Sequence, residues 1–289
     1  MQNKLHNKTA IITGGSQGIG LKIAEHFLKN GANVLICARH QDKIDAALKA
    51  LKLLCNGNKV IGKTGDIANK KHCEDLIATC LETFNRLDIL INNAGILGAK
   101  GATDVVDWNA WESAIEVNLK GAAFLCHLAL PHMKKQSSGK IIILSGGGAT
   151  KSMPFMSAYA ASKAALVRFG ECLSDELKPF YIDVNSVAPG AINTEILNEI
   201  LNAGPELIGN EHYQKVLTQQ KNGGNDIERA AKLCVFLASS ESNGITGKLI
   251  SAIWDPWENL LQHRDELINS DIYTLRRITP EDRNKDWTP

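Results

Sequence analysis

The sequence predicts an α/β fold, in which one doubly wound parallel sheet of about seven strands carries helices on both of its faces. Short β-branched apolar runs alternate along the chain with segments of roughly 12 to 25 residues that have helical periodicity. The apolar runs are continuous blocks, which is typical of strands that are covered on both faces. No linker rich in Pro, Gly or Ser divides the 289 residues, so we expect a single large domain.

Six apolar runs are predicted strands, and a helical segment separates each from the next. A chain that alternates in this way cannot pair neighbouring strands as hairpins, so the strands should lie parallel. In the first helical segment, Ile19, Ile23 and Phe27 share one face, and Gly31 supplies a stop signal. The predicted strands span residues 9–13, 33–38, 59–63, 87–92, 140–144 and 183–187.

The last third of the chain differs from this pattern. Residues 191–225 are less regular and contain several Gly and Pro turn signals. Residues 254–289 form a C-terminal extension that is too apolar for a solvated tail. Within it, Trp257, Leu260 and Leu261 suit a short amphipathic helix that begins after Pro256. We therefore expect a domain of residues 1–253 followed by an extension of residues 254–289.

The composition excludes several classes of protein. The chain carries 32 basic and 31 acidic side chains and a net charge of +1, which argues against a nucleic acid or a membrane as partner. No uncharged apolar stretch reaches the ~18 residues that a bilayer span needs, and the N-terminus lacks the apolar core of a secretion signal. The cysteines have no C-x-x-C spacing and the histidines no metal-binding spacing. We expect a cytoplasmic protein with reduced cysteines and no metal site.

A glycine-rich turn directly after the first predicted strand is a candidate phosphate site. The segment from Thr13 to Gly20, T-G-G-S-Q-G-I-G, joins this strand to the first helix. Glycines at such a turn let backbone N–H groups approach a phosphate, and the dipole of the following helix favours negative charge there. The candidate binding residues are Gly14, Ser16, Gln17, Gly18, Ile19 and Gly20.

Tyr159 and Lys163 form a candidate catalytic pair. They lie four residues apart in a helix-forming segment, so both side chains should share one face. A phenol with an ordinary pKa of about 10 is a poor acid or base at neutral pH. A neighbouring ammonium group would lower that pKa and suit the tyrosine to general acid or base catalysis. The alternative is an aromatic core residue with a solvated lysine nearby.

Together with three further motifs, these features resemble the short-chain dehydrogenases/reductases. The glycine spacing is G-x-x-x-G-x-G, Tyr159 to Lys163 matches Y-x-x-x-K, and residues 92–95 match N-N-A-G. Pro189-Gly190 with Thr194 matches P-G-x-x-x-T, and Asn118 matches the family's helix asparagine. The motifs occur in the family's order, and the resemblance covers roughly residues 5–250.

The resemblance implies a Rossmann-type fold and an NAD(P)-dependent oxidoreductase that transfers a hydride between a nicotinamide cofactor and a small carbonyl or alcohol substrate. In the family, the tyrosine is the general acid or base, the lysine also contacts the nicotinamide ribose, and the asparagine holds a water in a proton relay. These roles carry over to Tyr159, Lys163 and Asn118. Further implied cofactor contacts are Ile67, Asn93, Ala94, Gly95, Pro189, Gly190, Ile192 and Thr194.

The family's catalytic serine is where this chain departs. The usual serine precedes the tyrosine by 13 residues, and Gly146 occupies that position, with Ser145 directly before it. A one-residue bulge in this glycine-rich segment would bring Ser145 into place, and we expect it to take the serine's role. Alternatively, a glycine N–H or a water polarises the substrate.

Cofactor choice should depend on the residues after the second predicted strand. A carboxylate there would bind the ribose hydroxyls of NAD, whereas an arginine suits the 2′-phosphate of NADP. The chain has Arg39 and no acidic residue at this point, which favours NADP(H). Asp66 resembles the family residue that meets the adenine, and it could also cap a helix.

Two other functions also fit the sequence. The missing serine favours a cofactor-binding regulatory protein with little turnover, and the superfamily also contains nucleotide-sugar epimerases. The family further implies a homotetramer or homodimer, which would pack the helices at about residues 108–133 and 157–178 against their symmetry mates. The substrate should contact residues 191–225 and the end of the chain. Deleting residues 255–289 is expected to preserve cofactor binding and to abolish turnover or assembly.

Overall fold

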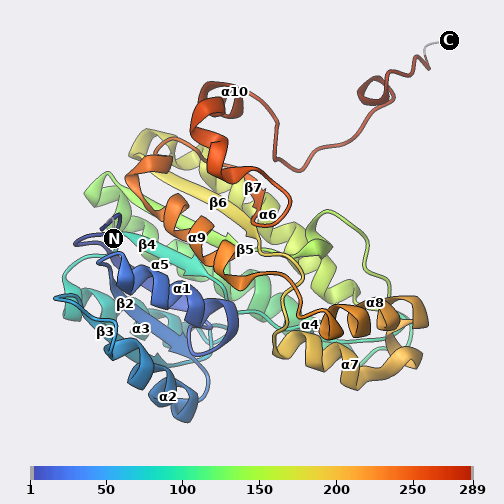
Figure 1. The fold of residues 1–289 in the computed structure, drawn as a ribbon, viewed down its shortest axis with the longest axis horizontal. Helices are drawn as coiled ribbons and strands as arrows, with labels where there is room; N and C mark the ends of the chain where they lie inside the picture. The colour runs from blue at the N-terminus through green and yellow to red at the C-terminus, as the bar shows by residue number, and fades with distance from the viewer. Residues whose placement is uncertain (1–2, 288–289) are drawn as a thin grey trace.

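A seven-stranded parallel sheet runs through the computed structural model, which describes residues 3–287 (Figure 1). The strand order is β3-β2-β1-β4-β5-β6-β7, so the chain winds outward from β1 in one direction and then from β4 in the other. This confirms the predicted doubly wound fold. The strands are β1 (Thr9–Thr13), β2 (Asn33–Ala38), β3 (Val60–Thr64), β4 (Ile89–Asn92), β5 (Gly139–Leu144), β6 (Ile182–Ala188) and β7 (Leu249–Ser251).

Helices cover both faces of the sheet and bury a separate apolar core on each. On β5, Ile142 and Leu144 join one core, and Ile141 and Ile143 join the other, because successive strand side chains point to opposite faces. The first core contains α1 (Gly18–Lys29), α2 (Gln41–Lys52) and α9 (Ile227–Ala238). The second contains α3 (Lys70–Phe84), α5 (Ala122–Gln136) and α6 (Ser157–Leu177).

The segment between β6 and α9 is more regular than the sequence indicates. It forms α7 (Glu195–Ile208) and α8 (Asn210–Lys221). Gly204 has a positive φ of 77° and kinks α7, and Gly209 separates the two helices. The turn signals in the sequence therefore mark a kink and a junction in a helical hairpin, and the expectation of an irregular segment is corrected.

The C-terminal extension begins on the protein's own body. Trp257 and Leu260 lie in a 3₁₀ segment (Trp257–His263) and Leu267 in α10 (Arg264–Ile268), and all three are buried in the first core. The helical stretch after Pro256 therefore exists, although its first part is 3₁₀. No helix in the described part of the chain combines the length and apolar character needed to cross a bilayer.

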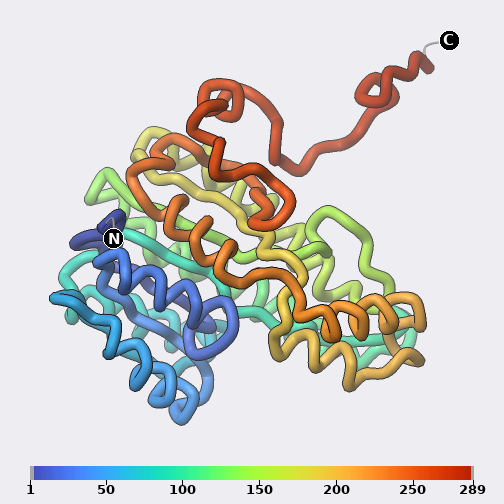
Figure 2. The backbone as a smooth tube through the Cα atoms, in the orientation of Figure 1, coloured from blue at the N-terminus to red at the C-terminus, as the bar shows by residue number. Residues whose placement is uncertain are grey.

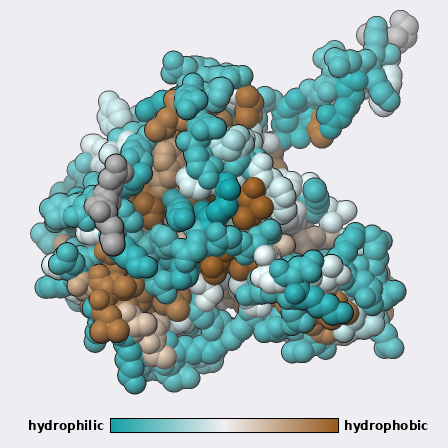
Figure 3. All heavy atoms as spheres, in the orientation of Figure 1, coloured by the Kyte–Doolittle hydropathy of each residue, from teal (hydrophilic) through white to brown (hydrophobic). Residues whose placement is uncertain are grey.

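The end of the chain is first anchored and then projects away from the body (Figures 1 and 2). Lys248 Nζ donates to the carbonyl oxygens of Ser270 and Ile272 at 2.8 and 3.0 Å. The N–H of Leu249 in β7 donates to the carbonyl of Tyr273 at 2.7 Å. The projecting part is mostly hydrophilic (Figure 3). The expectation that the whole extension is too apolar for solvent is therefore wrong for this part and holds only for the anchored part before it.

Candidate active site

The predicted site residues gather at one edge of the sheet. The glycine-rich turn follows β1, Arg39 follows β2, Asp66 follows β3, and Gly95 follows β4. Ser145 follows β5, and the segment of residues 189–194 follows β6. Because all the strands are parallel, their carboxyl ends lie at the same edge. β1 and β4 adjoin where the winding reverses, which is where open α/β sheets bind ligands.

The turn after β1 is suited to a phosphate. Its glycines leave the backbone open, and larger residues would not fit at their positions. Gly14 and Gly18 have φ values of 64° and 55°, in the left-handed region that favours glycine. A Cβ on Gly20 would lie 2.3 Å from the carbonyl oxygen of Gly14. Gln17 is the N-cap of α1, and its side chain leaves the first N–H groups of the helix uncapped. These groups and the helix dipole suit the diphosphate of a nicotinamide cofactor.

The segment after β4 is tied directly to this turn. Asn93 Nδ2 donates to the carbonyl of Thr13 at 2.8 Å, and the hydroxyl of Thr13 accepts from the N–H groups of Asn93 and Ala94, each at 3.0 Å. A Cβ on Gly95 would lie 3.4 Å from Lys163 Nζ. The N-N-A-G motif thus links the phosphate cradle to the Tyr159–Lys163 pair.

Tyr159 and Lys163 lie together on α6, as their spacing predicts. Lys163 Nζ is 5.8 Å from the centroid of the Tyr159 ring and donates to the carbonyl of Leu144 at 2.8 Å. Burial raises the pKa of Tyr159 to about 12 and lowers the pKa of Lys163 to about 8. The expected lowering of the phenol pKa is therefore wrong for the protein without cofactor, because desolvation dominates over the nearby ammonium.

Asn118 lies in a π-helical segment (Glu116–Gly121) between α4 (Trp108–Ile115) and α5. Its side chain accepts from the N–H of Ile96 at 2.8 Å and donates to the Ile96 carbonyl and the Ser162 hydroxyl, both at 2.9 Å. Single π turns in α-helices are frequent at functional sites. Ser162, which the sequence reasoning missed, in turn donates to the carbonyl of Tyr159 at 2.8 Å.

Ser145 does not reach the tyrosine hydroxyl. Its N–H donates to the carbonyl of Val187 at 2.8 Å and continues the ladder between β5 and β6, so the expected bulge is absent from this stretch. Its Oγ is buried and has no hydrogen-bond partner among the described residues. Gly146 lies beside the hydroxyl instead: a Cβ on it would be 2.6 Å from the Tyr159 oxygen. The register of β5 against β6 decides which residue faces Tyr159, and the sequence does not reveal it. The expectation that a bulge brings Ser145 into place is therefore corrected.

Arg39 and Asp66 follow β2 and β3, on the far side of the glycine-rich turn from β4. Arg39 is exposed directly after β2. Asp66 Oδ1 accepts from the N–H of Ala68 at 2.9 Å, whereas Asn69 caps α3. Asp66 therefore stabilises a turn rather than a helix end. Ile67 is buried, and its carbonyl oxygen would lie 2.5 Å from a Cβ on Gly121.

The segment after β6 closes the site from the other side. Gly190 has a φ of 92°, and Ile192 packs partly buried against the first core. Thr194 is the N-cap of α7, and its methyl group would lie 3.6 Å from a Cβ on Gly18. Pro189 directly follows the end of β6. The end of the P-G-x-x-x-T motif thus lies beside the glycine-rich turn.

Three polar side chains form a bridge between the glycine-rich turn, α2 and α7, which the sequence did not predict. Lys43 Nζ on α2 donates to Gln17 Oε1 at 2.9 Å and to Glu195 Oε1 at 2.8 Å. Gln17 Nε2 also donates to Glu195. The bridge connects the glycine-rich turn to α2 and to the first residue of α7. No sequence motif predicts it, because its members are far apart in the chain.

The helical hairpin of α7 and α8 forms an apolar cover over the tyrosine. Tyr159 packs against a small buried cluster. The cluster consists of Leu97, Met156, Leu197, Ile200, Ile208 and Val216. Because four of these residues come from α7 and α8, the hairpin supplies most of the apolar surface on this side of Tyr159.

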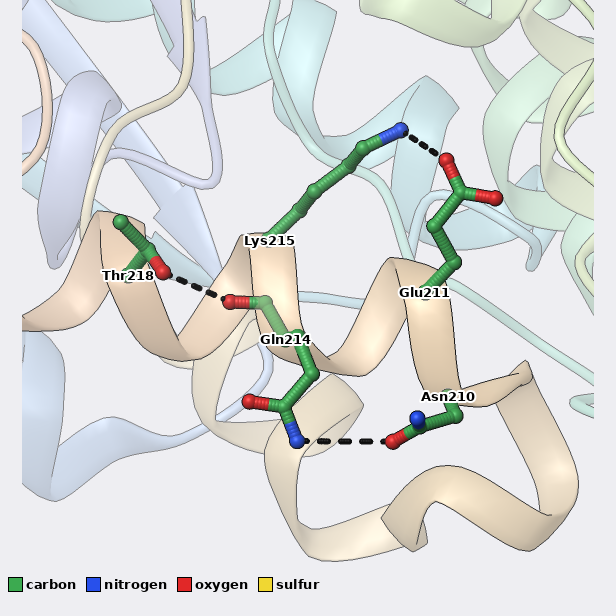
Figure 4. A pocket seen from close by; sticks show the side chains of 5 residues that line it. All are labelled: Asn210, Glu211, Gln214, Lys215 and Thr218. Atoms are coloured by element: carbon green, nitrogen blue, oxygen red, sulfur yellow. Dashed lines mark hydrogen bonds and ion pairs between the residues drawn. The ribbon is translucent and has the colours of Figure 1, made fainter.

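The outer face of α8 carries a separate open hollow (Figure 4). Its lining residues are Asn210, Glu211, Gln214, Lys215 and Thr218. They come from one helix and bond among themselves, for example through the 2.6 Å ion pair of Lys215 with Glu211. None of the predicted site residues lines this hollow, so it is not the active site.

Comparisons with known proteins agree with this geometry. Residues 8–204 match the model of the short chain dehydrogenase family. The chain is 34% identical over 251 residues to dehydrogenase/reductase SDR family member 4 of Caenorhabditis elegans, covering 86% of this chain and 94% of that protein. The Bos taurus protein of the same name is 32% identical over 249 residues, covering 86% and 87%.

Solved structures share the fold. The structure of levodione reductase has a TM-score of 0.78 at 22% identity and covers 86% of this chain and 96% of that one. The structure of NAD⁺-bound xylitol dehydrogenase has a TM-score of 0.79 at 22% identity, with coverage of 86% and 98%. Together with the motifs at the carboxyl edge of the sheet, the matches show that this chain belongs to the short chain dehydrogenase family of NAD(P)-dependent oxidoreductases.

Proposed function

We propose that this protein is an NADP(H)-preferring oxidoreductase that interconverts a carbonyl and an alcohol, with Tyr159 as its general acid and base. The observation that carries the proposal is the position of Tyr159. Its hydroxyl lies at the carboxyl edge of the sheet beside Gly146, and Lys163 follows one helical turn later. When bound, the nicotinamide supplies or accepts the hydride.

The protein's own residues account for the proton. With a pKa raised to about 12 by burial, Tyr159 keeps its proton at neutral pH and can donate it to a substrate oxygen during reduction. In the reverse direction, the tyrosine first gives up its proton to solvent, and the phenolate then accepts the hydroxyl proton of the alcohol; the Lys163 ammonium favours the phenolate. Asn118 and Ser162 form a hydrogen-bonded chain to the tyrosine backbone and hold this segment of α6 in place.

The role of Tyr159 is tested by Tyr159→Phe. Removing the hydroxyl removes the proton donor and leaves the ring, so kcat should fall by ~10²–10⁴. The dissociation constant of NADPH, measured by fluorescence titration, should stay nearly unchanged. Turnover is followed by the absorbance of the reduced nicotinamide with a panel of ketones and aldehydes.

Two results would count against this proposal. Unchanged turnover in the variant would remove Tyr159 from the mechanism. Cofactor binding without any oxidation of NADPH, across a broad panel, would instead favour a regulatory protein that binds the cofactor.

The preference for NADP(H) depends on Arg39. We expect Arg39→Ala to weaken NADPH binding by on the order of 1–3 kcal/mol, the usual contribution of a charge-assisted hydrogen bond. Arg39→Asp should also strengthen NADH binding, because a carboxylate accepts from the ribose hydroxyls. The dissociation constants of both cofactors measure this. A natural protein that already prefers NADH would contradict the assignment.

A further inference from the structure

The three glycines after β5 have three different surroundings. A Cβ on Gly146 would lie 2.6 Å from the hydroxyl oxygen of Tyr159. A Cβ on Gly147 would meet nothing within 4 Å. A Cβ on Gly148 would lie 2.9 Å from the backbone Cα of Ala160. Only the first of these contacts involves the proposed catalytic atom.

Gly146 is not required by its backbone conformation. Its φ and ψ are −169° and 172°, an extended conformation that any residue adopts. The obstacle to a side chain at this position is therefore the tyrosine alone. The next contacts of such a Cβ, at 3.4 and 3.5 Å, are also atoms of the Tyr159 ring.

The contact between position 146 and the tyrosine hydroxyl bears on why the usual serine is absent. A glycine at position 146 could mean that a catalytic serine was lost and that its space is empty. The structure shows instead that the tyrosine hydroxyl occupies the space that a side chain at position 146 would need. A serine placed here would push the hydroxyl away from the end of β5.

We propose that Gly146 is a positioning residue, which lets the hydroxyl of Tyr159 lie against the end of β5, and that any side chain at position 146 displaces it. The proposal rests on the proposed catalytic role of Tyr159. It predicts that Gly146→Ser, which restores the residue usual in the family, lowers the activity instead of raising it.

Energetics separate this role from a structural one. The atom that must move is the far end of one side chain, so the fold can accommodate a Cβ at position 146 at little cost. Catalysis is more sensitive than the fold, because a misplacement of about 1 Å in a reacting group can cost on the order of 10²-fold in rate. At position 148, a Cβ would lie 2.9 Å both from the α6 backbone at Ala160 and from Met153 Sδ, so it should cost stability instead.

The experiment compares Gly146→Ala and Gly146→Ser with Gly147→Ala as the matched control. For both Gly146 variants we expect kcat to fall by on the order of 10²-fold, with unchanged KM, NADPH affinity and thermal midpoint. Gly147→Ala should keep full activity, because its Cβ enters open space and its φ lies outside the left-handed region. Gly148→Ala should lower the thermal midpoint. It serves as the control for a variant whose defect is a loss of stability.

A double-mutant cycle covers the case in which the Gly146 variants fold poorly. In a Tyr159→Phe background the interfering oxygen is gone, so Gly146→Ala should destabilise the protein less than it does with the tyrosine present. If Gly146→Ala does lower stability with the tyrosine present, an equal loss in the Tyr159→Phe background would overturn the proposal. So would full kcat in Gly146→Ala or a gain of activity in Gly146→Ser.

The outcomes also separate this inference from the proposed function. If Tyr159→Phe is inactive and Gly146→Ala is fully active, the positioning role fails and the catalytic tyrosine stands. If Tyr159→Phe keeps its turnover, the catalytic role itself fails, whatever the Gly146 variants do.

Discussion

Lys163 is an ammonium group enclosed by protein, and its burial has a measurable cost. Its pKa in the folded protein is about 8, against an ordinary value of 10.5. Between these two pH values the unfolded chain binds more protons than the native protein, so the contribution of Lys163 to stability rises with pH. Below about pH 8 the native state must hold a charged, desolvated amine.

Lys163→Met should therefore change stability in a pH-dependent way. Methionine has a similar length and no charge, so the variant avoids the desolvation cost that the wild-type protein bears below about pH 8. Relative to wild type, the variant should be most stable at about pH 7 and lose this advantage towards about pH 9.5. Urea unfolding of both proteins at the two pH values measures it. A difference that does not depend on pH would contradict the buried charge.

At the scale of single residues, the sequence predicts which side chains lie close together. It predicts less well their pKa values and the atoms through which they make contact. Helical spacing alone places Tyr159 and Lys163 on one face of α6. The direction of the tyrosine pKa was not predictable, because it depends on burial by segments that are remote in sequence. The role of Ser145 was not predictable either, since one residue of strand register decides whether position 145 or 146 lies beside the hydroxyl.

At the scale of elements, strands with a core on both faces were the easiest to predict. The predicted strands at residues 9–13 and 33–38 coincide with β1 and β2, and the other four differ at their ends by one or two residues. These strands are short apolar blocks rich in β-branched residues, and their length and composition distinguish them from buried helices. β7 has only three residues, too few for any pattern, and no range was predicted for it.

The C-terminal extension divides into two parts that should respond differently to truncation. Deleting residues 255–289 removes Trp257, Leu260 and Leu267 from the first core, and truncating one such large side chain typically costs about 2–5 kcal/mol. This deletion should therefore impair folding as well as activity, which corrects the expectation that cofactor binding survives it. Deleting residues 276–289 should leave the free energy of unfolding nearly unchanged.

Deleting residues 276–289 should cost little stability because of where their bonds lie. Arg276 pairs with Asp271 just before the segment and with Asp282 inside it, and the backbone bonds of residues 282–285 stay within the segment. Denaturant unfolding and NADPH titration of both truncated proteins compare the two parts. Equal stability of the two truncations would show that the buried tryptophan and leucines contribute nothing.

At the scale of the whole molecule, we expect a homodimer or homotetramer. The outer face of α6 exposes Ala161, Ala165, Arg168 and Cys172 at helical spacing, and all of them except Arg168 have small side chains. Small side chains of this kind let a second helix approach closely. Light scattering at micromolar concentration measures the mass in solution. A mass near the 31.4 kDa of one chain would contradict this expectation.

The anchoring of the extension also protects the sheet. β7 lies at one end of the strand order, and an edge strand offers unpaired N–H and C=O groups to which any other extended chain can add. Here the outward N–H of Leu249 is already bonded to Tyr273, and Lys248 holds the segment that carries this tyrosine. A chain that ended before Ser270 would present this edge to its neighbours and would be prone to aggregate. Residues far from Tyr159 thus keep β7 from pairing with the strand of a neighbouring molecule.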